Sequence, residues 1–197
     1  MNPKGILYYK ATLEARFPLI LIFGREPNDS NDTVDSDNWQ YDFSDHPRCA
    51  FWNISHSLIG GSCDLTAAQL KAKFRQRNCS PILYSDSSPI SIPNSALRKA
   101  KIRKGITEEE IDNHIDLVFS NKEIIDRVKI VILSGLYKSD FSYSKNLIIQ
   151  KCADKGIVPC EVPFFYGTNK KDIISQAENY LPIIKSICNQ FFETNKV

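Results

Sequence analysis

The sequence predicts an α/β fold of three layers, with a short, mostly parallel sheet between two layers of helices. Two continuous apolar runs, Pro18–Phe23 and Ile130–Ser134, are typical of strands buried on both faces of a parallel sheet. Segments with apolar residues at helical spacing separate these runs, and parallel strands need such crossovers. The 197 residues suit one domain, which we expect to span residues 1–197.

The other elements follow from start and stop signals along the chain. Pro47 predicts a helix start, and Gly60-Gly61 predicts the end of that helix. Thr66 is an N-cap signal, and Thr107 with Glu110 forms a capping box at another helix start. We expect further helices at 66–77, 107–119, 144–155 and 171–192, and strands at 80–85 and 157–162.

Composition excludes several functional classes. Lys and Arg number 25 against 23 Asp and Glu, so the net charge of +2 does not by itself indicate nucleic-acid binding. No apolar run is long enough to cross a bilayer, and residues 1–4 lack the features of a signal peptide. The 6 cysteines form no C-x-x-C pair, so we expect reduced thiols and no metal. These observations predict a cytoplasmic protein with no membrane association and no cofactor.

In parallel sheets, ligands bind beyond the carboxyl ends of the strands. We therefore expect functional residues within 24–28, 85–93, 135–140 and 163–169. The sharpest motif is Gly24-Arg25-Glu26-Pro27-Asn28, directly after the first strand. A carboxylate from Glu26 at this edge could activate water and stabilise an oxocarbenium-like transition state. The alternative is a surface turn in which Glu26 is solvated.

A second motif precedes the helix that starts near Pro47. Either Tyr41 or Phe43 could stack on a nucleobase, and the helix start favours a phosphate near His46. A helix-capping role is the alternative for His46.

Together these segments resemble the uracil-DNA glycosylase superfamily, most closely its mismatch-specific (thymine/uracil) branch. The resemblance extends over about residues 17–185. It implies a uracil-DNA glycosylase-like fold and a monofunctional glycosylase, in which Glu26 activates water, Phe43 or Tyr41 stacks on the flipped base, and Arg25 and Asn28 line the base site.

The resemblance also has one clear departure. Residues 163–169 fall at the second motif, where the family has His or Asn followed by Pro-Ser, but this chain has Phe164 at the His or Asn position. The loss of one such donor typically costs about 10²–10³ in rate. Tyr166 or Asn169 could compensate, or the leaving base could be a larger modified pyrimidine, such as the glucosylated hydroxymethylcytosine that some phage-defence glycosylases of this kind remove.

We expect DNA as the partner and a monomeric protein. The resemblance assigns DNA contacts to Gly167, Thr168 and Asn169, which are followed by Lys170 and Lys171. A basic stretch at 95–104 adds local charge, although it could equally be a solvated face. The acidic loop with Asp29, Asp32, Asp35 and Asp37 would repel phosphate; we expect a disordered loop that faces solvent, and the alternative is a cation site. Two alternatives are a glycosylase-like protein that binds a nucleotide or nucleic acid without chemistry, and an unrelated α/β domain.

Overall fold

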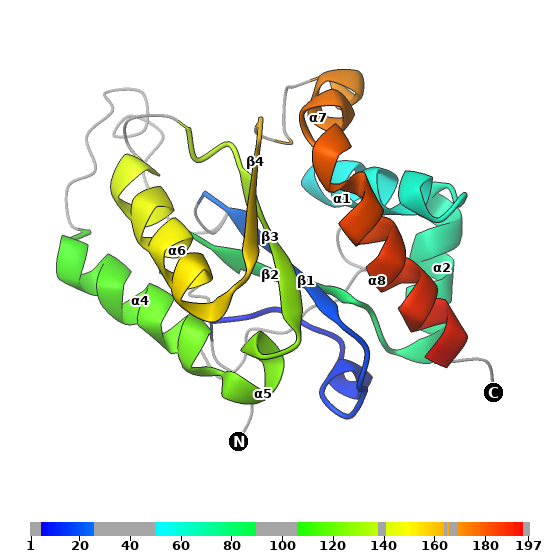
Figure 1. Ribbon diagram of the computed structural model, residues 1–197, viewed down its shortest axis with the longest axis horizontal. Coiled ribbons are helices and arrows are strands. Elements are labelled where there is room, and N and C mark those ends of the chain that lie inside the picture. The colour runs from blue at the N-terminus through cyan, green and yellow to red at the C-terminus, as the bar shows by residue number, and fades with distance from the viewer. Residues whose placement is uncertain are drawn as a thin grey trace.

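The computed structural model describes residues 5–25, 50–89, 106–137, 141–163, 165 and 169–194. This part of the chain contains one sheet of four strands: β1 (Leu19–Gly24), β2 (Ile82–Asp86), β3 (Val128–Ser134) and β4 (Val158–Val162). The strand order is β2-β1-β3-β4, and every neighbouring pair is parallel (Figure 1). The predicted parallel sheet is therefore confirmed.

Helices flank this sheet on both faces, which confirms the three-layer α/β/α architecture (Figure 1). Helices α4 and α6 lie on one face, and α1, α2, α7 and α8 lie on the other. The helical elements of the described chain are η1 (Lys10–Thr12), α1 (Ala50–Ser62), α2 (Ala67–Arg77), α4 (Glu108–Ser120), α5 (Lys122–Ile125), α6 (Ser142–Lys155), α7 (Lys170–Gln176), η3 (Glu178–Tyr180) and α8 (Leu181–Thr194).

The order of the strands explains why the helices divide between the two faces. From β1 the chain moves to its neighbour β2, and from β2 it returns past β1 to β3 and then to β4. Parallel crossovers are right-handed, so travel in opposite directions places the connecting helices on opposite faces. The direction changes between β1 and β3, and a change of this kind opens a crevice at the carboxyl ends of the two strands.

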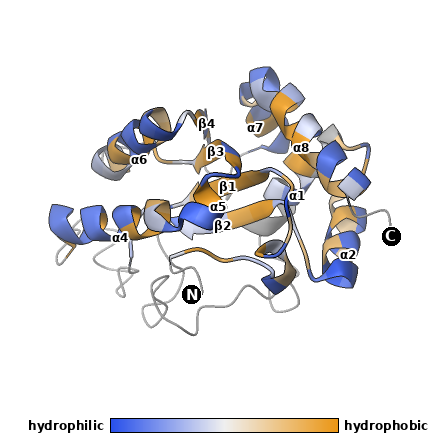
Figure 2. Ribbon diagram, turned by 60° about the horizontal axis from the view of Figure 1, so that its bottom comes forward, coloured by the Kyte–Doolittle hydropathy of each residue, from blue (hydrophilic) through white to orange (hydrophobic). Residues whose placement is uncertain are grey.

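The hydrophobic core surrounds the central strand. All 6 residues of β1 are buried, and Leu19 to Phe23 are 0% exposed. A strand covered by helices on both faces has no solvent side, so its sequence shows a continuous apolar run rather than alternation. Figure 2 shows the hydrophobic strands at the centre and mainly hydrophilic residues on the outward faces of α2, α4 and α6.

Local signals fixed several helix ends as predicted. Thr66 caps α2 in a capping box with Gln69, and Thr107 caps α4 in a capping box with Glu110. In both boxes the threonine hydroxyl accepts from a backbone N–H while the partner side chain accepts from the threonine N–H. Gly156 ends α6 with a φ of 65°, a conformation that glycine adopts without steric cost.

The predicted end of the first helix is wrong by two residues. Helix α1 continues through Gly60 and Gly61 to Ser62. Gly60 is required by a close approach, because a Cβ there would lie 2.6 Å from the carbonyl oxygen of Leu65. The Leu65 N–H donates to the Gly60 carbonyl at 2.8 Å, so this contact closes the turn into α2. A Cβ built at Gly61, by contrast, would meet nothing within 4 Å beyond its chain neighbours and the nearby backbone of its own helix.

The single C-terminal helix predicted for 171–192 is also wrong. The structure has α7, the short η3 and then α8, with Pro182 in the first turn of α8. Proline has no backbone N–H to donate and clashes with the carbonyl four residues earlier, so a continuous helix cannot pass through this position without a break. At the start of a helix the missing N–H costs nothing, which is why Pro182 is accommodated in α8.

Candidate functional site at the carboxyl edge

The candidate site is the edge of the sheet where the four parallel strands end. Ser87 lies just beyond β2 and contacts the end of β1 twice. Its N–H donates to the Gly24 carbonyl at 3.0 Å, and its hydroxyl donates to the Arg25 carbonyl at 2.7 Å. The Gly135 N–H, just beyond β3, donates to the Val162 carbonyl of β4 at 2.9 Å. Hydrogen bonds therefore continue across this edge beyond the ends of the strands.

The side chain of Arg25 reaches from the end of β1 to the residue that follows β3. Its Nε donates to the Gly135 carbonyl at 3.1 Å, and its guanidinium carbon lies 5.6 Å from the centre of the Phe141 ring. A cation over an aromatic face is attracted to the ring quadrupole. The Ser87 hydroxyl also binds the Arg25 carbonyl. Arg25 is therefore bound by residues that follow both neighbours of β1, which are β2 and β3.

Several polar side chains buried beneath this edge were not singled out from the sequence. His114 of α4 is 1% exposed, and its Nε2 lies 2.7 Å from the Asp86 carbonyl at the end of β2. The Ser134 hydroxyl accepts from the Phe165 N–H at 3.2 Å, and the Ser85 hydroxyl donates to the Gly5 carbonyl at 2.7 Å. Ser85 lies within the predicted range 85–93, whereas His114 and Ser134 lie outside all four predicted ranges.

Phe165 lies in the core rather than at the site. Its side chain is 0% exposed, and its N–H is bound to Ser134. By contrast, Tyr137 follows β3 within the predicted segment 135–140 and is 58% exposed. Tyr137 and Tyr143 are the large hydrophobic residues with exposed side chains among those that the structure describes. An aromatic ring accessible near Gly135 can stack on a planar ligand.

The lysines assigned to DNA binding begin α7, beyond the end of β4. Asn169 is the N-cap of this helix, and its Oδ1 accepts from the Lys171 N–H at 3.0 Å. Lys170 and Lys171 are both exposed. Arg25 follows β1, whereas Lys170 begins the helix that follows β4, and β3 lies between these two strands in the sheet.

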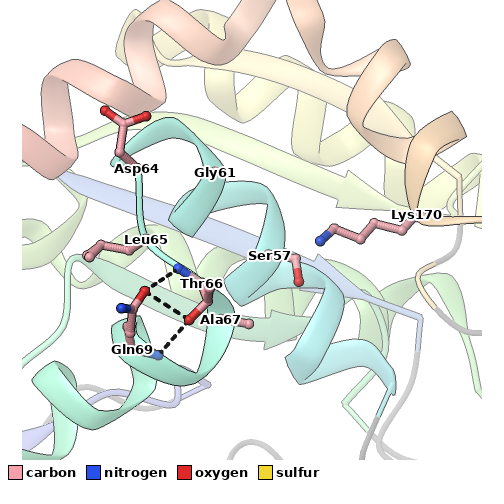
Figure 3. A pocket seen from close by; sticks show the side chains of 8 residues that line it. All are labelled: Ser57, Gly61, Asp64, Leu65, Thr66, Ala67, Gln69 and Lys170. Carbon is pink, nitrogen blue, oxygen red and sulfur yellow. Dashed lines mark hydrogen bonds between the residues drawn. The ribbon is translucent and has the colours of Figure 1, made fainter.

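Lys170 also lines a pocket of about 380 Å³ between α1, the start of α2 and α7 (Figure 3). Figure 3 shows its side chain extending toward Ser57 of α1, while Asp64 lies near the opposite end of the pocket. The lining combines one cation, one carboxylate and the capping box of α2, and it includes no residue of the β1–β3 crevice. The lining residues are Ser57, Gly61, Asp64, Leu65, Thr66, Ala67, Gln69 and Lys170.

The structure thus describes four of the residues assigned to the site: Arg25, Asn169, Lys170 and Lys171. It brings Arg25 to the crevice and the other three to the same edge of the sheet. The remaining assigned residues lie outside the described ranges, as do the basic stretch 95–104 and the acidic loop: Glu26, Asn28, Tyr41, Phe43, His46, Phe164, Tyr166, Gly167 and Thr168.

Within the described residues, no group of three or more His, Cys, Asp or Glu side chains is arranged to hold a metal ion. None of the described helices has both the length and the apolar character needed to cross a bilayer. Comparisons of the chain with protein-family models, with curated proteins and with solved structures found no match. The class that the fold itself defines is a small three-layer α/β protein with a parallel, doubly wound sheet.

Proposed function

We propose that this protein is a DNA glycosylase that hydrolyses the N-glycosidic bond of a flipped-out pyrimidine nucleotide and leaves an abasic site. The observation that carries this proposal is the position of Arg25, held by Ser87 and Gly135 at the crevice between β1 and β3. Glu26 follows it directly in the chain. The three-layer architecture agrees with the fold that the sequence resemblance implies, and ligands of such sheets bind at this crevice.

In the proposed reaction, Glu26 directs a water molecule at the anomeric carbon of the extruded nucleotide. The bond between that carbon and the base nitrogen breaks, the water oxygen bonds to the carbon, and the base leaves with a proton. The negative Glu26 carboxylate stabilises the positive charge that develops on the sugar. Stacking of the base on Phe43 or Tyr41 holds it during the reaction.

The departing base needs a donor, and Phe164 cannot supply one. Tyr166 and Asn169 are the two candidates for a replacement donor, and the structure describes Asn169. Its Oδ1 accepts from the Lys171 N–H, so its Nδ2 group is the part that can donate to the base. A larger modified pyrimidine, such as glucosylated hydroxymethylcytosine, is a second way to accommodate the change. We propose DNA as the partner, with Lys170 and Lys171 near the phosphates, and a monomer acting in the cytoplasm.

The test is release of a free base from DNA. The full-length protein is incubated with duplexes that contain uracil, mismatched thymine or glucosylated hydroxymethylcytosine, and released bases are identified by mass spectrometry. We expect abasic sites in one of these duplexes and no strand scission. Absence of release from all of them would remove the enzymatic proposal.

A variant pair assigns the role of Glu26. Glu26→Gln should lower single-turnover excision by about 100-fold or more, since the carboxylate that activates water is lost, while DNA affinity by gel shift changes little. Glu14→Gln is the matched control, because Glu14 is exposed and precedes the amino end of β1. Unchanged excision by Glu26→Gln would show that another group activates the water.

The second candidate function is binding of nucleic acid or a nucleotide without chemistry. The observation that favours it is Phe164, which replaces the donor of the second motif. A protein of this kind retards DNA in a gel but releases no base from any of the three duplexes, so the assay above separates the two functions.

A further inference from the structure

Two cysteine thiols meet where α1 ends and α8 passes it. Cys63 follows the last residue of α1, and Cys188 lies in the second half of α8. Both sulfur atoms approach the same carbonyl oxygen, that of Ile59, with Cys63 Sγ at 3.2 Å and Cys188 Sγ at 3.9 Å. The two sulfurs, 125 positions apart in the sequence, therefore lie within a few ångströms of one atom.

The packing around the pair gives the two thiols different access to solvent. Helices α1 and α8 pack against each other, and Cys188 is 1% exposed on the buried face of α8, between Ile184 and Phe191. Cys63 is only partly buried and is followed by the exposed Asp64. Cys63 therefore has some access to solvent, whereas Cys188 has almost none.

The electrostatic setting also makes Cys63 the more reactive thiol. A hydrogen bond from Cys188 lowers the pKa of Cys63, and the positive charge of Lys185 acts in the same direction, while burial and Asp64 oppose them. The same hydrogen bond and burial raise the pKa of Cys188. A partly exposed thiol with a lowered pKa beside a second cysteine is the usual arrangement of an oxidation-sensitive pair.

The other described cysteines lack this arrangement. Cys79, Cys152 and Cys160 are buried. Burial raises the pKa of Cys79, and it raises the pKa of Cys152 and of Cys160 to about 12. Their thiols stay protonated at neutral pH and are inaccessible, so they serve as internal controls.

We propose that Cys63 and Cys188 form an oxidation site that accepts a peroxide and closes into a disulfide between α1 and α8. The Cys63 thiolate attacks a peroxide oxygen, the O–O bond breaks, and Cys63 becomes a sulfenic acid. The Cys188 sulfur then attacks the Cys63 sulfur and displaces hydroxide, which leaves as water with the Cys188 proton. In sum, two thiols and one hydrogen peroxide give one disulfide and two waters. This site does not depend on the proposed glycosylase activity.

The experiment treats the full-length protein with hydrogen peroxide, alkylates the remaining thiols, and maps the peptides by mass spectrometry. We expect a Cys63–Cys188 cross-linked peptide with loss of two hydrogen atoms, reversed by dithiothreitol. Because the bond closes a long loop of the unfolded chain, the melting temperature should rise by roughly 5–15 °C. Free Cys63 and Cys188 after treatment, or a disulfide that joins either one to Cys49, would overturn the proposal.

Two variants separate the steps. In Cys188→Ser, Cys63 should stop at the sulfenic acid, which gains one oxygen atom and is trapped by dimedone. In Cys152→Ser, the matched control, the cross-link should form as in the original chain. If either variant fails to fold, the rate of alkylation in the unmodified protein decides: among the described cysteines Cys63 must react first, and a faster reaction of Cys79, Cys152 or Cys160 would contradict the assignment.

Discussion

Different hydrogen bonds hold the two ends of the parallel strands, here called the amino edge, where the strands begin, and the carboxyl edge, where they end. At the amino edge, the guanidinium of Arg127 donates to the carbonyl oxygens of Thr12, Ala15 and Glu123, with distances between 2.6 and 3.2 Å. Beside it, the Thr12 hydroxyl donates to the Ser80 carbonyl and accepts from the Ser80 N–H, both at 3.1 Å. One arginine and one threonine thus tie the segment before β1 to the segments before β2 and β3.

At the carboxyl edge, the hydrogen bonds are distributed over several residues, and no single side chain there binds three carbonyl groups of the described residues as Arg127 does. Ser87 binds the Arg25 carbonyl, Arg25 binds the Gly135 carbonyl, and Ser134 binds the Phe165 N–H. The amino edge thus concentrates its hydrogen bonds on one arginine and one threonine, whereas those of the carboxyl edge surround the residue that precedes Glu26. Substitutions at the two edges should therefore separate stability from function.

The largest effect on stability is expected from Arg127→Met at the amino edge. This change leaves three carbonyl groups without their donor, and hydrogen bonds to a charged group are worth about 1.5–3 kcal/mol each before compensation by water. We expect the free energy of unfolding to fall by about 3 kcal/mol in urea titrations. Arg16→Met is the control, because Arg16 is an exposed arginine in the segment before β1. A loss equal to that of the control would contradict the role of Arg127.

A smaller loss of stability is expected from Arg25→Met at the carboxyl edge. The variant loses the bond to Gly135 and the contact with Phe141, which together contribute about 1–2 kcal/mol. If the proposed glycosylase activity is present, excision of the base should fall more than tenfold in this variant although the protein remains folded. The expected result is contradicted if Arg25→Met loses as much free energy of unfolding as Arg127→Met while the excision rate of the folded fraction stays unchanged. The carboxyl edge would then serve stability and not function.

Ser87→Ala tests the role of a single hydrogen bond at the carboxyl edge, the one from the Ser87 hydroxyl to the Arg25 carbonyl. The Ser87 side chain fixes the carbonyl of the peptide that joins Arg25 to Glu26. Its loss should cost about 1 kcal/mol of stability and should lower the excision rate with little change in DNA affinity. Ser87→Thr, which keeps the hydroxyl, should restore the rate. Equal behaviour of the alanine and threonine variants would show that the hydroxyl has no positioning role.

The smallest effect concerns a contact between the two helices that start at the carboxyl edge. The Tyr143 hydroxyl of α6 donates to Asp112 of α4 at 2.8 Å, and this bond, followed by weaker effects of desolvation and nearby carboxylates, raises the pKa of Tyr143 to about 12. Because the folded-state pKa lies above the unfolded value, the contact stabilises the fold below about pH 10 and is lost as the pH rises through about 12.

A spectrophotometric titration tests this shift. In the original chain, Tyr143 should ionise at a higher pH than an ordinary tyrosine, which delays the rise of tyrosinate absorbance. In Asp112→Asn, one tyrosine fewer should show this delayed ionisation. Tyr8, whose pKa is raised by burial, remains late in both proteins and serves as the reference. Superimposable titration curves would mean that Asp112 does not control Tyr143.

Much of the fold could be predicted because its signals are local. The apolar runs of β1 and β3, the capping boxes at Thr66 and Thr107, and the stop at Gly156 each depend on a few neighbouring residues. The misplaced end of α1 had a different cause, since Gly60 is needed for a contact with Leu65 that only the folded turn creates. The break before α8 had a local signal in Pro182, and the long apolar periodicity on both sides of it concealed that signal.

The candidate site was harder to predict for the same physical reason. Gly24-Arg25 follows a strand, so the sequence could place it at the carboxyl edge, but Ser87 and Gly135 have no motif of their own. They become partners of Arg25 because β1 lies between β2 and β3. Likewise, the spacing of the cysteines gave no indication that Cys63 and Cys188 share one carbonyl neighbour.

The strands, most helix starts and the helical connections could be predicted from the amino-acid sequence alone, because propensity, capping and hydrophobic periodicity act over a few residues. Tertiary structure decided the order of the strands, and hence that the change of direction falls between β1 and β3. That order depends on how the apolar faces of all helices and strands are buried together, which is a property of the whole chain and of no single segment.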